Sequence, residues 1–391
     1  MPPVDTPPVD TAPDPRRSPL IATAGCAATY PDAARSLTAA LGPGPFACLI
    51  LFVSPQADLP AFASAIAALH PAIPVIGCTT AGEISASGYA EGQIVALALP
   101  ARNFATEPLL IPDLSAIDAT ALIGSLIRAR AALHRHHPDW EHEFAFLMVD
   151  GLSLREDELA TALAQGLGPV PLFGGSAGDG TRFGQTFVLH GAQVLGHAAV
   201  MVMVRTDCRA QVFNLDHLVP TARRMVVTGA DPARRIVHQI NAEPAAREYA
   251  RLLGKDPAQL TSFTFAAHPL VVRIGGKHHV RAIQRVAPNG DLVFFSAIDE
   301  GVVLTLAEPQ DMVAHLDREL SALSRGIAPE AILACDCILR RMEAEEKQSS
   351  RAVSQVLRKH RVTGFSTYGE QLNGMHVNQT MTGVALYPPG A

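Results

Sequence analysis

Cysteine, aromatic residues and long apolar runs are all scarce in this sequence of 391 residues. It has 6 cysteines, 1 tryptophan and 5% aromatic residues. So few cysteines exclude a secreted scaffold held together by many disulfides, and free thiols are expected instead. No apolar run approaches the roughly 20 residues needed to cross a bilayer, so no membrane partner is expected. The net charge of −6 excludes a general electrostatic match to nucleic acid. Together these absences predict a cytoplasmic protein.

What the chain does contain is enough apolar sequence for two cores. Apolar residues make up 48% and charged residues 17%, which is typical of well-packed globular domains. At this length two domains are expected rather than one. Residues 1–17 contain the tandem copy PPVDTPPVDT and little apolar sequence. That composition predicts a disordered, proline-rich leader.

Helix and strand patterns are mixed along the rest of the chain. Apolar runs such as residues 47–53 and 198–204 predict buried strands, and the helical spacing of apolar residues predicts helices such as 116–135. A further helix is expected over residues 155–167, with Ser153 as its N-cap. The mixture predicts an α+β fold of two domains, each with a mainly β-sheet core and packed helices.

The domain boundary is expected near a polar stretch in the middle of the chain. Residues 213–225 are polar, basic and contain a proline, which suits a crossing between domains. We therefore place a first domain at residues 18–222 and a second at residues 223–391.

The segment Gly174-Gly175-Ser176-Ala177-Gly178 matches the nucleophile elbow of serine hydrolases. An elbow needs a helix directly after its serine, because the helix N-terminus helps to hold the oxyanion. Residues 178–180 are Gly-Asp-Gly, which predicts a tight turn in place of a helix. We therefore expect no enzyme activity, and a serine hydrolase using Ser176 is the alternative.

Polar side chains gather beside the closing strand of the sequence. Seven of the twelve residues from 368 to 379 have hydrogen-bonding side chains. Each such group costs roughly 1–3 kcal/mol if it is buried without a partner, so these groups must serve one another or a ligand. We predict that Tyr368, Glu370, His376 and Asn378 line a ligand cleft of the second domain.

Arginine pairs lie near the expected boundary between the domains. Arg223 and Arg224 precede a short apolar stretch there. Guanidinium groups bind carboxylates and phosphates, so these two residues could hold an acidic ligand in a cleft. The alternative is ordinary ion pairing with acidic surface residues.

Four segments together resemble the FIST family, a bacterial sensory module. The segments VIGCTTAGEIS and DGLSLREDELATALAQGLGPVPLFGGSAGDG resemble its N-terminal half. The segments PTARRMVVTGADPARRIVHQINAEPAAREYARLLG and GFSTYGEQLNGMHVNQTMTGVAL resemble the start and the end of the FIST C-terminal domain. The resemblance implies a sensor for a small ligand. Within this family, the sequence is similar to the nitric-oxide-sensing branch. That similarity implies haem as cofactor and a histidine kinase or a cyclic-di-GMP enzyme as partner.

Haem requires an imidazole ligand, an apolar pocket and cations for its propionates. His217 lies just before the arginine pair, and His376 lies in the closing polar stretch, so either could bind the iron. Further candidates are His238, His268, His278 and His279. A structural histidine is the alternative for each, and a metal-free module that binds an amino acid is the alternative ligand class. The sequence leaves the oligomeric state open.

Overall fold

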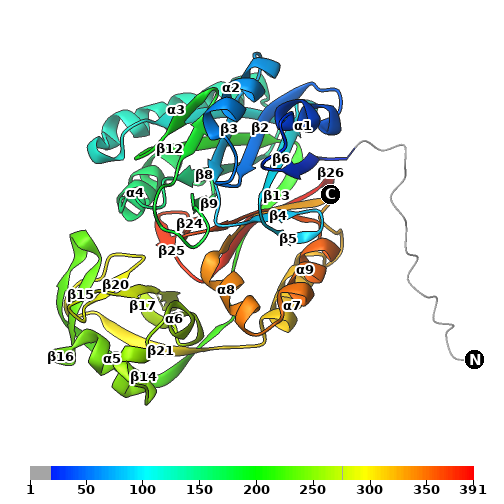
Figure 1. The fold of residues 1–391 in the computed structure, drawn as a ribbon. Helices are drawn as coiled ribbons and strands as arrows, with labels where there is room; N and C mark the ends of the chain where they lie inside the picture. The colour runs from blue at the N-terminus through cyan, green and yellow to red at the C-terminus, as the bar shows by residue number, and fades with distance from the viewer. Residues whose placement is uncertain (1–18, 275) are drawn as a thin grey trace, which may run out of the picture.

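The computed structural model describes residues 19–274 and 276–391, so the predicted leader lies outside the described residues. The chain forms two lobes (Figure 1). A three-sheet lobe contains residues 19–217 and 310–391, and a small lobe contains residues 218–309. Both lobes have a β-sheet core with packed helices. The predicted α+β fold with two domains is therefore confirmed.

The first sheet of the three-sheet lobe is covered on its outer face by two helices. Its strands, in spatial order, are β1 (Ala22–Ala27), β6 (Gln93–Pro100), β2 (Phe46–Val53), β3 (Val75–Thr79), β10 (Val188–His190) and β11 (Gln193–Leu195), and its helices are α1 (Ala33–Leu41) and α2 (Leu59–Leu69). Alternate residues of a strand point to opposite faces. In β2, Ile50 and Phe52 face the central core while Leu49 and Leu51 face the helices. Both faces of β2 are buried, which explains its unbroken apolar sequence.

The second sheet is made mostly from the N-terminal half of the chain. Its strands, in spatial order, are β25 (Met375–Val377), β24 (Glu370–Leu372), β9 (Leu172–Ser176), β8 (His142–Val149), β12 (Ala199–Thr206) and β7 (Phe104–Ile111), and its helices are α3 (Ala119–His136) and α4 (Glu156–Leu167). The hairpin of β24 and β25 comes from the C-terminal half and pairs with β9.

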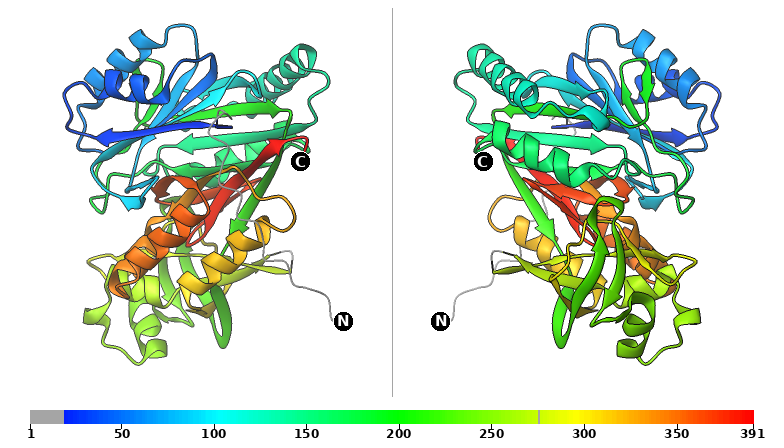
Figure 2. Two further views of the ribbon diagram at one scale, coloured as in Figure 1. Left: turned by 90° about the vertical axis from the view of Figure 1, so that its right-hand side faces the viewer. Right: turned by 90° about the vertical axis from the view of Figure 1, so that its left-hand side faces the viewer.

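The third sheet is made mostly from the C-terminal half of the chain and includes a hairpin from the N-terminal half. Its strands, in spatial order, are β13 (Cys208–Leu215), β26 (Met381–Pro389), β22 (Ala331–Cys337), β23 (Val362–Thr367), β4 (Glu83–Ser85) and β5 (Gly88–Ala90), and its helices are α7 (Met312–Leu323), α8 (Ile338–Glu346) and α9 (Ser350–Lys359). The hairpin of β4 and β5 comes from the N-terminal half and pairs with β23. Both views of Figure 2 show the red strand β26 beside the green strand β13. The two halves of the chain therefore interlock.

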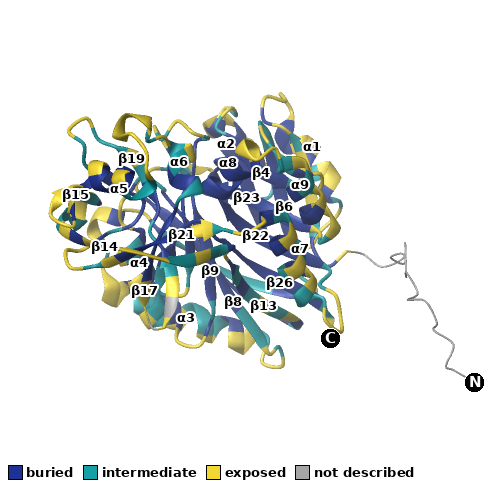
Figure 3. Ribbon diagram, turned by 90° about the horizontal axis from the view of Figure 1, so that it is seen from below, coloured by how far each residue is buried: buried dark blue, intermediate teal, exposed yellow. Residues whose placement is uncertain are grey.

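The inner faces of the three sheets share one apolar core, and its central strands β22 and β23 are buried along their whole length (Figure 3). Phe52 stacks on Phe365 with ring centroids 4.7 Å apart, which joins the two halves of the chain directly. Phe146 and Phe173 pack at 4.9 Å in the same core. Burying each such side chain contributes roughly 1.5–3 kcal/mol, so the shared core binds the halves strongly.

The small lobe is inserted between β13 and α7. Its strands are β14 (Leu218–Asp231), β15 (Ile236–Ile240), β16 (Glu243–Pro244), β17 (Leu270–Ile274), β18 (Lys277–Val280), β19 (Ile283–Val286), β20 (Leu292–Phe294) and β21 (Val303–Pro309), and its helices are α5 (Ala245–Leu253) and α6 (Ser262–Ala267). The small lobe also has two short 3₁₀ helices, Pro232–Arg234 and Pro257–Gln259, and a third, Leu114–Ala116, belongs to the three-sheet lobe. No helix within the described ranges combines the length and the apolar character needed to cross a membrane.

Two local details differ from the sequence-based expectations. The predicted boundary after residue 222 falls inside β14, and the chain crosses between the lobes at residues 216–217. Helix α4 begins at Glu156 without a side-chain cap, and the Ser153 hydroxyl accepts a hydrogen bond of 3.3 Å from the Arg155 amide instead. Ser153 was therefore wrongly predicted as the N-cap, because it lies too far before the helix to reach its first amides.

Candidate functional site

The closing polar stretch lies where the two lobes meet. Tyr368, Glu370, His376 and Asn378 are each no more than 2% exposed. The hairpin of β24 and β25 places Glu370 opposite Gly175 of β9, which belongs to the N-terminal half. The stretch is therefore an internal wall between the halves of the chain, rather than part of the second domain alone.

Tyr368 holds the loop that follows β9. Its hydroxyl contacts the Asp179 carboxylate and accepts hydrogen bonds from the amides of Asp179 at 3.0 Å and Phe183 at 3.3 Å. Its ring also stacks on the Phe183 ring at 4.4 Å. Burial raises the pKa of Tyr368, so the hydroxyl keeps the proton that it donates. These contacts use the hydrogen-bonding capacity of the hydroxyl within the protein, and a ligand contact for Tyr368 stays a prediction.

Glu370 is a fully buried carboxyl group. One of its oxygens, Oε2, accepts hydrogen bonds from the Thr380 amide at 3.2 Å and the Thr380 hydroxyl at 2.8 Å. The other, Oε1, lies 2.9 Å from the Thr367 hydroxyl. Burial raises the pKa of Glu370 to about 8, although these hydrogen bonds oppose the shift. Glu370 is therefore mostly protonated at neutral pH.

Ser176, the last residue of β9, belongs to a buried polar chain. The Gln371 side-chain amide donates to the Ser176 hydroxyl at 3.0 Å and lies 3.3 Å from Nδ1 of His376. Residues 177–187 contain no helix, so the predicted turn after Ser176 is confirmed. A nucleophilic serine needs a base within hydrogen-bonding reach. Here Gln371 is the side chain that separates Ser176 from the imidazole, and this arrangement does not favour the hydrolase alternative.

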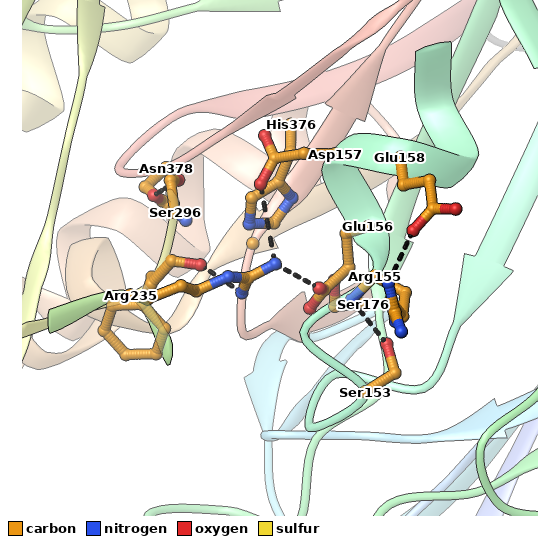
Figure 4. Close-up of polar contacts among 12 residues, drawn as sticks. Ser153, Arg155, Glu156, Asp157, Glu158, Ser176, Arg235, Ser296, His376 and Asn378 are labelled. Carbon is orange, nitrogen blue, oxygen red and sulfur yellow. Dashed lines mark hydrogen bonds and ion pairs between the residues drawn. The ribbon is translucent and has the colours of Figure 1, made fainter. Parts of the chain in front are cut away.

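Polar contacts from the small lobe and from α4 reach the same wall (Figure 4). The Ser296 hydroxyl donates to the Asn378 side-chain oxygen at 2.8 Å. The Arg235 guanidinium is 2.5 Å from the Glu156 carboxylate and 3.5 Å from the Asp157 carboxylate. Arg235 belongs to the small lobe and the two acids begin α4, so this ion pair joins the lobes. The acids also suit the positive end of the α4 dipole.

Three atoms of the wall keep unused hydrogen-bonding capacity. Within residues 19–274 and 276–391, Oε1 of Gln371, Nδ2 of Asn378 and Oε1 of Gln379 are buried and have no hydrogen-bond partner. Nearly all buried polar groups in proteins are paired. The wall is therefore not completely satisfied by the residues that form it.

The predicted arginine pair is split between two faces of β14. Arg223 donates to the Leu252 carbonyl at 3.2 Å. Arg224 lines a cavity of about 740 Å³ in the small lobe, together with Arg273 and Arg281. The structure therefore places Arg224 at a cavity that can hold a ligand, and it places Arg223 elsewhere, because neighbouring residues of a strand point to opposite faces.

His217 lies in a buried network of charged side chains. Its Nδ1 accepts a hydrogen bond of 2.8 Å from the Arg340 guanidinium, and its Nε2 is 2.9 Å from the Glu343 carboxylate. Burial lowers the pKa of His217, so the ring is neutral and donates from Nε2. The lone pair that an iron ion would need is already used by Arg340. The surroundings of His217 therefore do not fit an iron ligand.

His376 is no better placed for iron. Its Nδ1 faces the donating amide of Gln371, and its Nε2 faces the backbone of Gly369 so closely that an added Cβ there would lie 2.7 Å away. Neither His217 nor His376 lines the 740 Å³ cavity. Among the residues described, no group of three or more His, Cys, Asp and Glu side chains is arranged for a metal ion. The geometry does not fit haem at either histidine, and haem stays a prediction from the resemblance.

Arg273 and Arg281 were not predicted as site residues from the sequence. From Pro257 to Gly290 the sequence has 4 basic Lys and Arg residues and no acidic residue. This imbalance was a usable signal, because a strand-rich segment with unbalanced positive charge predicts an anion site. The ion pair of Arg235 had no local signal in the sequence, because its partners Glu156 and Asp157 on α4 lie far away along the chain.

Comparison with known protein families identifies matches along most of the chain. A search of curated proteins finds no match to it. The FIST N domain model matches residues 47–243, and the FIST C domain model matches residues 245–373. The first match alone spans more than half of the chain. FIST domains are sensory domains, and the protein belongs to the FIST family.

Proposed function

We propose that the protein is a sensor that binds a small ligand in the 740 Å³ cavity of the small lobe and thereby changes the contact between its lobes. The cavity has the size typical of ligand sites. Its inner surface includes the buried residues Val272, Ile298 and Thr305, and its arginines are more exposed. An apolar floor with a few charged groups is the usual composition of a small-molecule site.

The observation that carries the proposal is that one short segment serves both the cavity and the contact between the lobes. Arg281 lines the cavity, while its neighbours Val280 and Ala282 pack in the apolar cluster between the lobes. Tyr368 and Leu339 of the three-sheet lobe belong to the same cluster. A ligand that moves Arg281 therefore acts on residues that touch the other lobe.

A second connection between the cavity and the other lobe is electrostatic. Burial lowers the pKa of Arg281, and the Asp157 carboxylate on α4 opposes this effect. Asp157 also lies 3.5 Å from Arg235. An anionic ligand bound to Arg281 would compete with the Asp157 carboxylate for interaction with the positive charge of the guanidinium group. Such a ligand would change the balance of ion pairs across the junction.

Hydrogen exchange of the full chain tests this proposal. The protein is incubated with a defined mixture of organic acids, amino acids and nucleotides, and exchange is compared with that of the protein alone. We expect slower exchange in β17 and β21 and a change at residues 280–282. The variant Val303→Trp, which fills the cavity from an exposed position on β21, should abolish both effects. Protection confined to other surfaces, or protection that survives Val303→Trp, would contradict the proposal.

The signalling partner proposed from the family resemblance is a histidine kinase or a cyclic-di-GMP enzyme in the cytoplasm. The proposed role is regulatory and not enzymatic. It is supported by a cavity that is linked to a lobe contact and by Gln371, whose side-chain amide lies between the Ser176 hydroxyl and the His376 imidazole. The autophosphorylation rate of a purified kinase, measured with and without the protein, tests the partner. A kinase rate that the protein does not change would count against this partner.

Haem is not part of the proposed mechanism, because the surroundings of His217 and His376 do not fit an iron ligand. The nitric-oxide prediction has its own test. The absorption spectrum of protein expressed with a haem supply would contain a Soret band if haem binds.

A further inference from the structure

We infer that the cavity of the small lobe selects a compact dianion, such as a dicarboxylate or inorganic phosphate, through Arg224, Arg273 and Arg281. This inference rests on the proposed function, since it names the chemical class of ligand for the same cavity. It is carried by the placement of the three arginines, their lack of acidic partners and the charge balance of the cavity wall.

The three arginines come from adjacent parts of one sheet. Thr305 of β21 is the register partner of Arg224 on β14 and also of Val271 on β17. Arg273 follows Val271 by two residues, and residues two apart in a strand share a face. Arg224 and Arg273 therefore stand on the same face of the sheet. Arg281 follows β18, which forms a hairpin with β17, and it lines the same cavity.

None of the three guanidinium groups has an acidic partner at ion-pair distance among residues 19–274 and 276–391. Arg281 donates to the Val280 carbonyl at 3.1 Å, and its interaction with Asp157 is longer than an ion pair. In the same lobe, Arg251 pairs with Glu248 at 2.6 Å and Arg235 pairs with Glu156 at 2.5 Å. The cavity arginines thus differ from Arg251 and Arg235, and they have donors available for another group.

The charge of the cavity wall favours an anion with more than one negative charge. Three arginines and His278 line the cavity, and Asp299 is its one acidic residue among those described. A sphere of 740 Å³ is about 11 Å across, which is comparable with the screening length of about 8–10 Å at physiological salt. The three positive charges therefore repel one another, and a bound dianion would neutralise the excess over Asp299.

Guanidinium geometry adds specificity to this charge. Each planar guanidinium can give two parallel hydrogen bonds to a carboxylate or a phosphate. Arginines from different strands can therefore hold two oxyanion groups at once, or several oxygens of one phosphate. The cavity-lining residues Ile298 and Val303 provide an apolar surface for the carbon chain of a dicarboxylate.

Isothermal titration of the full chain tests the inference with three probes: glutarate, inorganic phosphate and the neutral glutaramide. We expect glutarate or phosphate to bind and glutaramide not to bind, and we expect weaker binding at 300 mM than at about 50 mM salt. Arg273→Gln should weaken anion binding by about ten- to a hundredfold, the loss expected for one charge-assisted contact. Arg285→Gln is the matched control, because Arg285 is exposed in the same lobe and does not line the cavity.

Each outcome bears on the inference. Equal binding of glutaramide, no binding of either anion at millimolar concentration, or equal losses in the two variants would overturn it. Anion binding that depends on Arg273 but leaves hydrogen exchange at residues 280–282 unchanged would support the dianion site and refute the proposed signalling. Glutaramide binding that alters this exchange, with no anion binding, would support signalling and refute the dianion site.

Discussion

Replacing Glu370 with glutamine should make the protein more stable at neutral pH relative to the wild type. The Thr367 hydroxyl lies 2.9 Å from Glu370 Oε1 and also donates to the Gly369 carbonyl at 2.8 Å. A hydroxyl has one hydrogen to give, so a protonated Glu370 can donate to Thr367 while Thr367 donates to Gly369. A glutamine amide can make the same donation, and its oxygen can still accept from Thr380. Glu370→Gln therefore imitates the protonated form.

The expected size follows from the pKa of Glu370. Its value in the folded protein is about 8, compared with 4.5 for the free group. Because the folded pKa is raised, this group's contribution to stability is complete below pH 4.5 and is lost as the pH rises toward 8. The loss is about 1.4 kcal/mol per pH unit in that range. It amounts to about 1 kcal/mol at pH 5.5 and about 3 kcal/mol at pH 7.

Urea unfolding at pH 5.5 and pH 7 measures this effect. The difference in unfolding free energy between Glu370→Gln and the wild type should move by about 2 kcal/mol in favour of the variant over that interval. Glu346→Gln is the control, since Glu346 is exposed and its replacement should leave the pH dependence unchanged. If the wild type and Glu370→Gln showed parallel pH dependence, the argument from burial would be refuted.

Three further predictions concern the closing stretch and its neighbours. Tyr368→Phe should reduce stability by about 2–3 kcal/mol, because Asp179 and two amides lose a buried partner; an unchanged urea midpoint would contradict this. Ser176→Ala should cost about 1–2 kcal/mol through the lost acceptor for Gln371 and should abolish no activity, and an esterase activity lost in this variant alone would reverse that view. Deleting residues 366–391 removes the strand between β13 and β22 and should abolish cooperative thermal unfolding, so unchanged melting followed by circular dichroism would contradict the fold.

The sequence was sufficient for elements whose signal is local. The apolar run that forms β2 and the helical spacing in α3 each give their structure from adjacent residues. Free thiols were also expected from the low cysteine content, and Cys335 and Cys337 are buried free cysteines of β22. The exchange of hairpins between the two halves was not predictable. Pairing of β24 with β9 depends on contacts between residues far apart in the sequence, which carry no local pattern.

The same distinction applies to the candidate site. The closing stretch was predicted to line a ligand cleft, which stays a prediction. Its burial brings a group such as Glu370 to partners within ten residues along the chain. Ser176 and Gln371 are 195 residues apart, so their hydrogen bond had no signature in the sequence. Arg224 was chosen for its charge. Its companions Arg273 and Arg281 are brought to it only by the pairing of β14, β21 and β17.

The position of β26 between β13 and β22 sets the order in which the protein can be completed during synthesis. When β13 leaves the ribosome, its pairing partner β26 has not yet been made. The small lobe and then α7, α8 and α9 are synthesised first. During this interval the N-terminal half exposes unpaired backbone groups, which favour aggregation. The small lobe takes its strands from one continuous segment of the chain, so it can fold first. Nascent chains of this protein are therefore expected to need chaperone protection until β26 is inserted.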